Sequence, residues 1–139
     1  MKTLALFLST LFLHLAGYAQ DQVNETHTIT IQVENVRNQE GQIHAGLYTK
    51  DTFMRMPASG TFAKINDDLT ASLTFENIAP GEYAILLYHD QNSNNRMDFE
   101  NNGMPKEDYA GSGPLTMGPP SWNEYKFTLS EPKEMTIRF

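Results

Sequence analysis

Apolar and polar residues alternate strictly in several short segments of the chain. In the first, residues 28–34, Ile29, Ile31 and Val33 are separated by polar residues, which is the period of a strand with one buried face. The same alternation, or a short run of strand-forming residues bounded by turn residues, recurs further along. The sequence predicts seven strands, at residues 28–34, 42–50, 61–66, 69–75, 83–88, 124–129 and 134–139.

The segment 83–88 differs from the others because it is apolar at nearly every position. Such a strand is covered on both faces, so we expect it to be central. Several short strands separated by turn residues, with no competing helical period, are typical of an all-β fold. We predict a seven-stranded antiparallel β-sandwich of immunoglobulin-like or transthyretin-like (prealbumin-like) type.

The N-terminus has the pattern of a secretory signal peptide. Lys2 precedes an apolar run over residues 4–16, and Gly17 and Ala19 are small. The run is too short for a lasting membrane span. We expect residues 1–19 to be a signal peptide, cleaved after Ala19, and residues 20–139 to form one β-sandwich domain.

Cysteine content and charge limit the cellular compartments and the classes of partner that suit this chain. The chain has no cysteine, so we expect no disulfide and no lipid anchor at the cleavage point. This predicts a secreted or periplasmic protein. Acidic residues outnumber basic ones 17 to 10, without any Lys/Arg cluster, which argues against nucleic acid and anionic membranes. An extracellular or periplasmic protein or glycan is the expected partner.

A regular spacing of Asp and Asn follows the predicted central strand. The motif D-x-[DN]-x-[DN] is typical of calcium loops, and Ca²⁺ takes six to eight oxygen ligands. With Asp90 at the first position of such a loop, alternate residues supply oxygens. The predicted ligands are Asp90, Asn92, Asn94, the carbonyl of Arg96, Asp98 and Glu100.

Two positions depart from the usual calcium loop. Asn95 replaces the glycine of the sharp turn, and Asn tolerates a left-handed conformation. The closing glutamate is absent from its usual position, so the closing carboxylate is Glu100, one residue early, or Glu107 or Asp108 farther along. Fewer charged ligands predict a weak structural site, with a Kd of roughly 10⁻⁴ to 10⁻³ M. Alternatively, the loop holds itself through hydrogen bonds from side chains to the backbone, without metal.

No catalytic motif stands out, so a non-enzymatic binding module with a calcium-ordered loop is the main expectation. His89, Glu107, Tyr109 and Trp122 form a possible ligand surface, although the two aromatic residues also suit the edge of a sandwich. One alternative is a metal-assisted hydrolase using His89 and the loop carboxylates. Another is a carrier of a small ligand or carbohydrate, which requires a cavity or an exposed aromatic stripe.

Three segments resemble a known family. They are the run FENIAPGEYAILLYHDQNSNNRMD over residues 75–98, the segment GMPKEDY over 103–109, and PPSW over 119–122. This combination resembles domain of unknown function 2141, a family of uncharacterised secreted bacterial proteins. The resemblance implies an exported bacterial protein and transfers no activity. The F-x-x-I-x-P-G-x-Y part also resembles carboxypeptidase-regulatory and transthyretin-like sandwiches, which supports the predicted fold.

Overall fold

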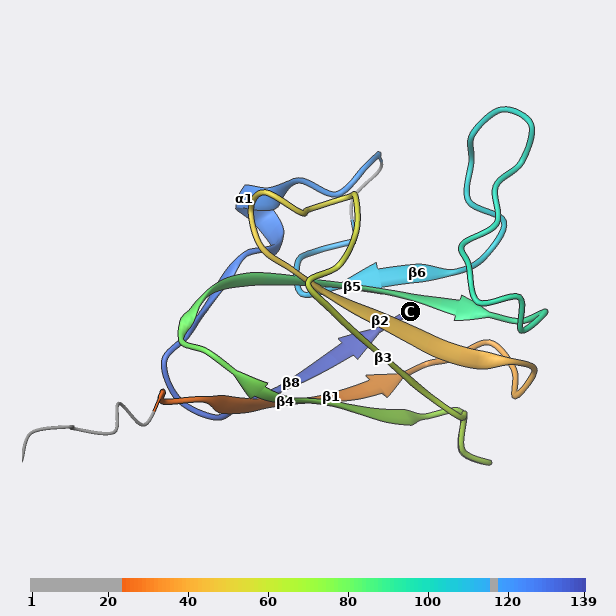
Figure 1. Cartoon of the computed structure of the whole chain (residues 1–139). Helices are drawn as coiled ribbons and strands as arrows, with labels where there is room; N and C mark the ends of the chain where they lie inside the picture. The colour runs from red at the N-terminus through yellow and green to blue at the C-terminus, as the bar shows by residue number, and fades with distance from the viewer. Residues whose placement is uncertain (1–23, 116–117) are drawn as a thin grey trace, which may run out of the picture.

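The computed structural model describes residues 24–115 and 118–139, and it contains eight strands and one helical turn over these residues (Figure 1). The predicted signal peptide, residues 1–19, lies outside the described part. None of the described helices is long and apolar enough to cross a membrane. The elements are β1 (His27–Glu34), β2 (Gln42–Tyr48), β3 (Ser59–Ala63), β4 (Ala71–Ile78), β5 (Gly81–Asp90), β6 (Tyr109–Gly111), α1 (Trp122–Tyr125), β7 (Phe127–Leu129) and β8 (Lys133–Arg138).

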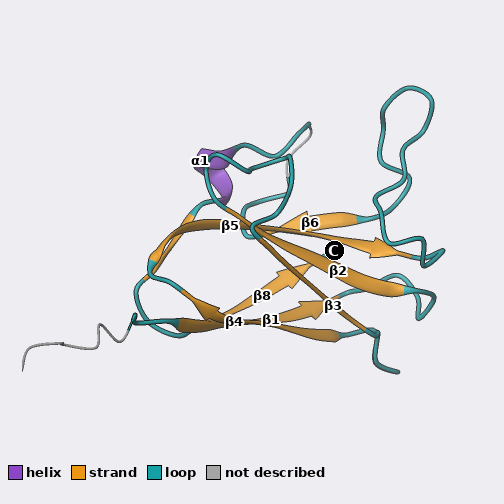
Figure 2. Cartoon of the chain, in the orientation of Figure 1, coloured by secondary structure: helices purple, strands orange, loops and turns teal. Residues whose placement is uncertain are grey.

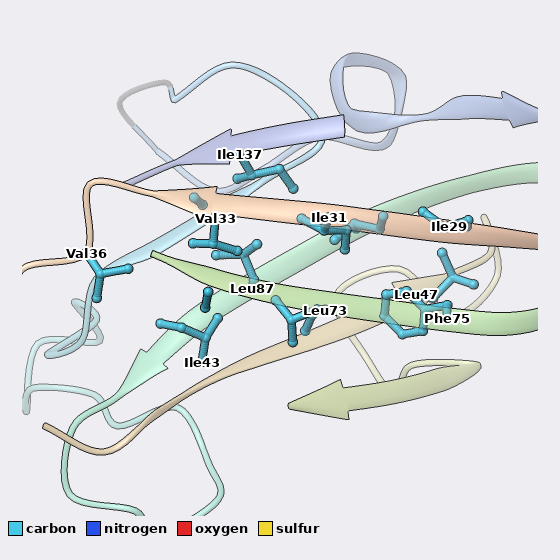
Figure 3. Close-up of a cluster of buried hydrophobic side chains, with 14 of the residues drawn as sticks. Ile29, Ile31, Val33, Val36, Ile43, Leu47, Leu73, Phe75, Leu87 and Ile137 are labelled. Carbon is cyan, nitrogen blue, oxygen red and sulfur yellow. The ribbon is translucent and has the colours of Figure 1, made fainter. Parts of the chain in front are cut away.

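The strands form two sheets that face each other (Figure 2). The three-stranded sheet has the order β4-β1-β8, and the five-stranded sheet has the order β3-β2-β5-β6, with β7 also paired to β5. Apolar side chains from both sheets fill the space between them (Figure 3). The predicted alternation produces this core, since Ile29, Ile31 and Val33 are fully buried while Gln32 between them is exposed. The all-β class and its two-sheet, sandwich-like arrangement are therefore confirmed.

Three details of the predicted architecture are wrong. Eight strands are present in the described residues rather than seven, because β6 lies inside the segment that was expected to be a loop. The predicted strand 124–129 is split, because Glu124 and Tyr125 belong to the single turn of α1, which precedes β7. The pairing is not purely antiparallel either, because β8 crosses from β7 to the other sheet and runs parallel to β1.

β5 is the central strand of the five-stranded sheet, as predicted. β2 pairs with it along residues 84–90 on one edge, while β6 pairs with residues 86–88 and β7 with residues 81–83. Ser112 lies where β6 ends: its Oγ accepts a hydrogen bond from the Ile85 N–H at 2.9 Å and donates one to the Tyr125 carbonyl at 2.6 Å. The Ser112 side chain thus supplies hydrogen bonds to β5 in the gap between β6 and β7, which are each only three residues long.

The alternation along β5 decides what each face of the sheet presents. Ile85, Leu87 and His89 are buried toward the other sheet, whereas Leu86 and Tyr88 lie on the outer face and are only half-buried. Asp90 ends the strand in register with these outer residues. The loop that follows, residues 91–108, projects from the end of the five-stranded sheet (Figure 1). We refer to it as the β5–β6 loop.

Candidate functional site

The carboxylate of Asp90 organises the first turn of the β5–β6 loop. Asp90 is fully buried, and its Oδ1 and Oδ2 accept hydrogen bonds from the N–H groups of Asn94 and Asn95 at 3.1 and 2.8 Å. The backbone can bend around the carboxylate because Ser93 and Asn95 adopt positive φ angles of 55° and 62°. Asn95 therefore takes the left-handed conformation expected at its position. The Nε2 of His44, from β2, lies 3.4 Å from Asp90 Oδ2.

Asn92 and Asn94 form two successive turns that direct both side chains to Asp98. The Oδ1 of Asn92 accepts a hydrogen bond from the Asn94 N–H at 3.1 Å, and the Oδ1 of Asn94 accepts one from the Arg96 N–H at 3.0 Å. Both side-chain amides donate to Oδ2 of Asp98, at 2.7 and 2.8 Å. Side-chain hydrogen bonds thus bring Asp90, Asn92, Asn94 and Asp98 together in one compact turn, which does not include Glu100.

Glu107 reaches this turn from the other end of the β5–β6 loop. Its Oε2 accepts a hydrogen bond from the Asp98 N–H at 3.2 Å. Glu107 is only 9% exposed, and its Oε1 is buried without a hydrogen-bond partner among the described residues. A carboxylate oxygen in this state lacks the partner that burial normally requires.

The two other candidates for the closing carboxylate lie elsewhere. A bridge between Phe99 and Pro105 makes the intervening residues a small hairpin, with Glu100 exposed near its start. Asp108 forms an ion pair with Arg37 at 2.7 Å, on the loop between β1 and β2. Of the three carboxylates that the sequence offered, Glu107 is the one that contacts the Asp90–Asp98 turn.

The pKa values of Glu107 and Asp98 are shifted because the two ends of the loop come together. Burial, followed by the charges of Asp90 and Asp98, raises the pKa of Glu107. The pKa of Asp98 is lowered, chiefly by its hydrogen bond from Asn92, with a further contribution from Arg96. In the described residues, no group of three or more His, Asp or Glu side chains has by itself the arrangement of a metal site. A cation held here would need the amide and carbonyl oxygens of the loop as well.

A family model described as an uncharacterized protein conserved in bacteria, DUF2141, matches residues 31–138. The chain belongs to the DUF2141 family. The match begins within β1 and ends with β8, so it spans both sheets and the whole β5–β6 loop of this DUF2141 protein. Comparison with curated proteins and with solved structures finds no match.

The four residues of the predicted ligand surface are not gathered in one place in this DUF2141 protein. His89 is fully buried between the sheets, with Nε2 2.6 Å from the Glu40 carbonyl oxygen and its ring beside Phe139. Trp122 lies on α1 and packs edge-on against Phe53, with ring centroids 5.6 Å apart. Tyr109 lies on the outer face of β6, in register with Tyr88.

The outer face of the five-stranded sheet holds a groove whose position was not predicted from the sequence. Its cavity volume is about 900 Å³, and its walls come from the β2–β3 connection, the β5–β6 loop and residues 118–120. Its floor includes His44, Tyr48 and Tyr88, whose alternation with buried residues was visible in the sequence. Only the pairing of β2 with β5 places them side by side.

Proposed function

We propose that this DUF2141 protein is an exported, non-enzymatic binding module whose β5–β6 loop is ordered by a bound Ca²⁺ ion. The ligands would be the side-chain oxygens of Asp90, Asn92, Asn94, Asp98 and Glu107, together with the Arg96 carbonyl. The observation that carries the proposal is the buried, unpartnered Oε1 of Glu107 beside the turn that contains the other oxygens. A cation at this point would supply the missing partner.

The charge balance of the loop supports a cation. Asp90, Asp98 and Glu107 are close enough for the first two to raise the pKa of the third. Arg96 lies 3.5 Å from Asp98 but is largely exposed, and His44 contacts Asp90 rather than Glu107. A divalent cation would offset the repulsion among the carboxylates and the cost of burying Glu107.

The ligand chemistry favours Ca²⁺ among the common cations. The candidate ligands are all oxygens, which suit hard cations, and the loop is irregular enough for a high and flexible coordination number. Each Asn Oδ1 has two lone pairs, so it can bind a cation and still accept the N–H of its turn. With three carboxylates in all, the site should be of the weak, extracellular type.

Two further features support the export and the absence of catalysis. The apolar run and small residues of segment 1–19, with no cysteine behind them, favour export and release. His89 is buried against the Glu40 carbonyl, so it is not paired with a loop carboxylate as a hydrolase would require.

A matched pair of variants tests the calcium proposal. Calorimetric titration and thermal melting are carried out on the wild type, Glu107→Gln and Glu100→Gln. For a Kd near 10⁻³ M, about 10 mM Ca²⁺ should stabilise the wild type by about 1.4 kcal/mol and raise the Tm by roughly 5 °C. Glu107→Gln should lose most of this shift, and Glu100→Gln should keep it. No heat and no shift for the wild type, or a loss confined to Glu100→Gln, would overturn the proposal.

A further inference from the structure

The two sheets present very different outer faces. On the three-stranded sheet, the outward side chains are polar, as expected for a face in contact with water. They include Thr30, Gln32, Ser72, Thr74, Glu134 and Thr136. On the five-stranded sheet, aromatic and apolar side chains occupy the corresponding positions. Since these side chains do not contribute to the core between the sheets, their apolar character needs another explanation.

Four of these side chains form a continuous row across the five-stranded sheet. Phe62 of β3 is in register with His44 of β2, His44 with Tyr88 of β5, and Tyr88 with Tyr109 of β6. The rings of His44 and Tyr88 stack with centroids 5.2 Å apart and planes 11° apart, and His44 and Phe62 lie 5.7 Å apart. Because His44 and Tyr88 stack on each other, part of their ring faces is covered, and the row lines the groove as a continuous aromatic surface.

The walls of the groove are also apolar. Met54, Phe99 and Met104 are 53%, 57% and 61% exposed, and all three line the groove. A cavity of about 900 Å³ with mostly apolar walls is within the range of small-molecule sites. Methionine side chains adapt to ligands of irregular shape, so these walls are suited to an organic molecule with a large apolar body.

The charged residues of the groove indicate the sign of the charge that a ligand would carry. Arg55 and Arg96 are the charged side chains that line it, and no carboxylate does so. This contrasts with the formal net charge of −7 for the whole chain. Within the described residues, Arg55 forms no ion pair, and Arg96 contacts only Asp98, at 3.5 Å. Burial, together with the charges of Asp90, Glu107 and Asp98, raises the pKa of Tyr88 to about 12, so an anionic group is complementary to the arginines of the groove and not to its Tyr88 end.

From the aromatic row, the apolar walls and the two arginines, we propose that the groove binds a small planar aromatic molecule carrying an anionic group. The ring system of the ligand lies on the row formed by Phe62, His44, Tyr88 and Tyr109. Its anionic group lies toward Arg55 of the β2–β3 connection, which forms no ion pair within the described residues, whereas Arg96 lines the wall formed by the β5–β6 loop and already contacts Asp98. A carbohydrate is a poorer fit, because the groove has few of the amide and carboxylate groups that pair with sugar hydroxyls. The row belongs to the sheet and does not depend on the calcium proposal, although one wall of the groove belongs to the β5–β6 loop.

Two related dyes test the proposal with chelator present throughout. The anionic probe is 8-anilinonaphthalene-1-sulfonate, and the neutral probe is N-phenyl-1-naphthylamine, both titrated by fluorescence under conditions where melting shows a fully folded protein. The anionic dye should bind one site per chain and more tightly than the neutral dye. Phe62→Ala should weaken both by about fivefold, because it removes a stacking surface. The double variant Arg55→Ala/Arg96→Ala should weaken only the anionic dye, by about tenfold.

Matched controls separate the groove from the rest of the surface. Met56→Ala and Lys64→Ala change exposed residues that do not line the groove, and both should bind the dyes like the wild type. Equal affinity for the two dyes, or equal losses in the control variants, would overturn the proposal. So would light scattering that shows a dimer closing the groove, or displacement of the dye by neutral oligosaccharides.

Discussion

Glu107 accepts a hydrogen bond from the backbone N–H of Asp98, with 3.2 Å between Oε2 and the nitrogen, although a hairpin separates the two residues. The bond joins the two ends of the β5–β6 loop. It also leaves Oε1 of Glu107 buried without a partner among the described residues. The metal-free loop is thus closed by a carboxylate that either a proton or a cation would stabilise.

Without metal, Glu107→Gln should stabilise the protein at neutral pH. Burial and the charges of Asp90 and Asp98 raise the pKa of Glu107, so the folded state holds this proton more tightly than the unfolded chain does. The stability gained from that proton is fully present below the unfolded pKa and is lost as the pH rises through the raised folded pKa. Urea unfolding with chelator should therefore find the variant about 1 kcal/mol more stable than the wild type at pH ~7. This difference in stability should shrink toward pH ~4.5. A difference that does not depend on pH would argue against a raised pKa of the buried Glu107 carboxylate.

Removing the Asp90 carboxylate should destabilise the loop and the end of β5 together. Asp90→Ala leaves the N–H groups of Asn94 and Asn95 without their acceptor. We expect a loss of about 3 kcal/mol, measured by urea unfolding, because hydrogen bonds to a buried charged group are among the stronger ones. Asp67→Ala, at an exposed position between β3 and β4, should change the stability by less than about 0.5 kcal/mol. Similar losses for both variants would contradict the role given to Asp90.

Gly41 should tolerate no side chain, although it is far from Asp90 in sequence. Its φ is +68°, and a Cβ added there would lie 1.8 Å from the Asp90 carbonyl oxygen. Gly41→Ala should therefore cost at least about 3 kcal/mol in thermal or urea unfolding. Gly103 is the matched control, because its φ is +82° but a Cβ there meets nothing within 4 Å. Gly103→Ala should cost only about 1 kcal/mol of backbone strain, and a larger loss there than at Gly41 would be contrary to the packing around Asp90.

Ser112→Ala should weaken the edge of β5 where β6 ends. The change removes the acceptor of the Ile85 N–H and the donor to the Tyr125 carbonyl. We expect a loss of about 1 to 3 kcal/mol, with faster amide exchange at Ile85. Ser72→Ala removes an exposed serine bonded to Gln32 and should cost less than about 0.5 kcal/mol. Unchanged exchange at Ile85 would show that Ser112 does not support the strand.

Calcium and the anionic dye should strengthen each other's binding. Arg96, Phe99 and Met104 line the groove and belong to the β5–β6 loop, so ordering the loop also orders one wall of the groove. The dye should bind about threefold more tightly in saturating Ca²⁺, and the Ca²⁺ affinity should rise by the same factor when dye is bound. In Glu107→Gln the dye affinity should not respond to Ca²⁺. A response that persists in this variant would show that Ca²⁺ acts elsewhere.

Much of the fold was predictable because its information is local. The alternation of Ile29, Ile31 and Val33 identifies a strand whatever its partner is, and the apolar run around Ile85 identifies the central one. β6 was not predicted, because Tyr109–Gly111 is too short to show a period and forms a strand only by pairing with the edge of β5. The parallel pairing of β1 with β8 depends on where the chain crosses between sheets, which the local pattern does not specify.

In the candidate site, too, some features could be predicted from the sequence and others could not. The turn from Asp90 to Asp98 was predictable from spacing, and the left-handed Asn95 was predictable from its residue type. The choice of Glu107 over Glu100 was not, because it depends on the hairpin closed by Phe99 and Pro105. The groove was hidden for a related reason: His44 and Tyr88 become neighbours only through strand pairing between distant segments.

A structure of crystals grown in about 10 mM CaCl₂ tests the claim that Glu107 closes a calcium site with the Asp90–Asp98 turn. The predicted result is an anomalous difference peak with oxygens of the proposed ligands, Asp90, Asn92, Asn94, Arg96, Asp98 and Glu107, at about 2.3–2.6 Å, while Glu100 remains in solvent. No peak at this position, with Oε1 of Glu107 still unpartnered, would contradict the claim. A peak bound by Glu100 in place of Glu107 would contradict it as well.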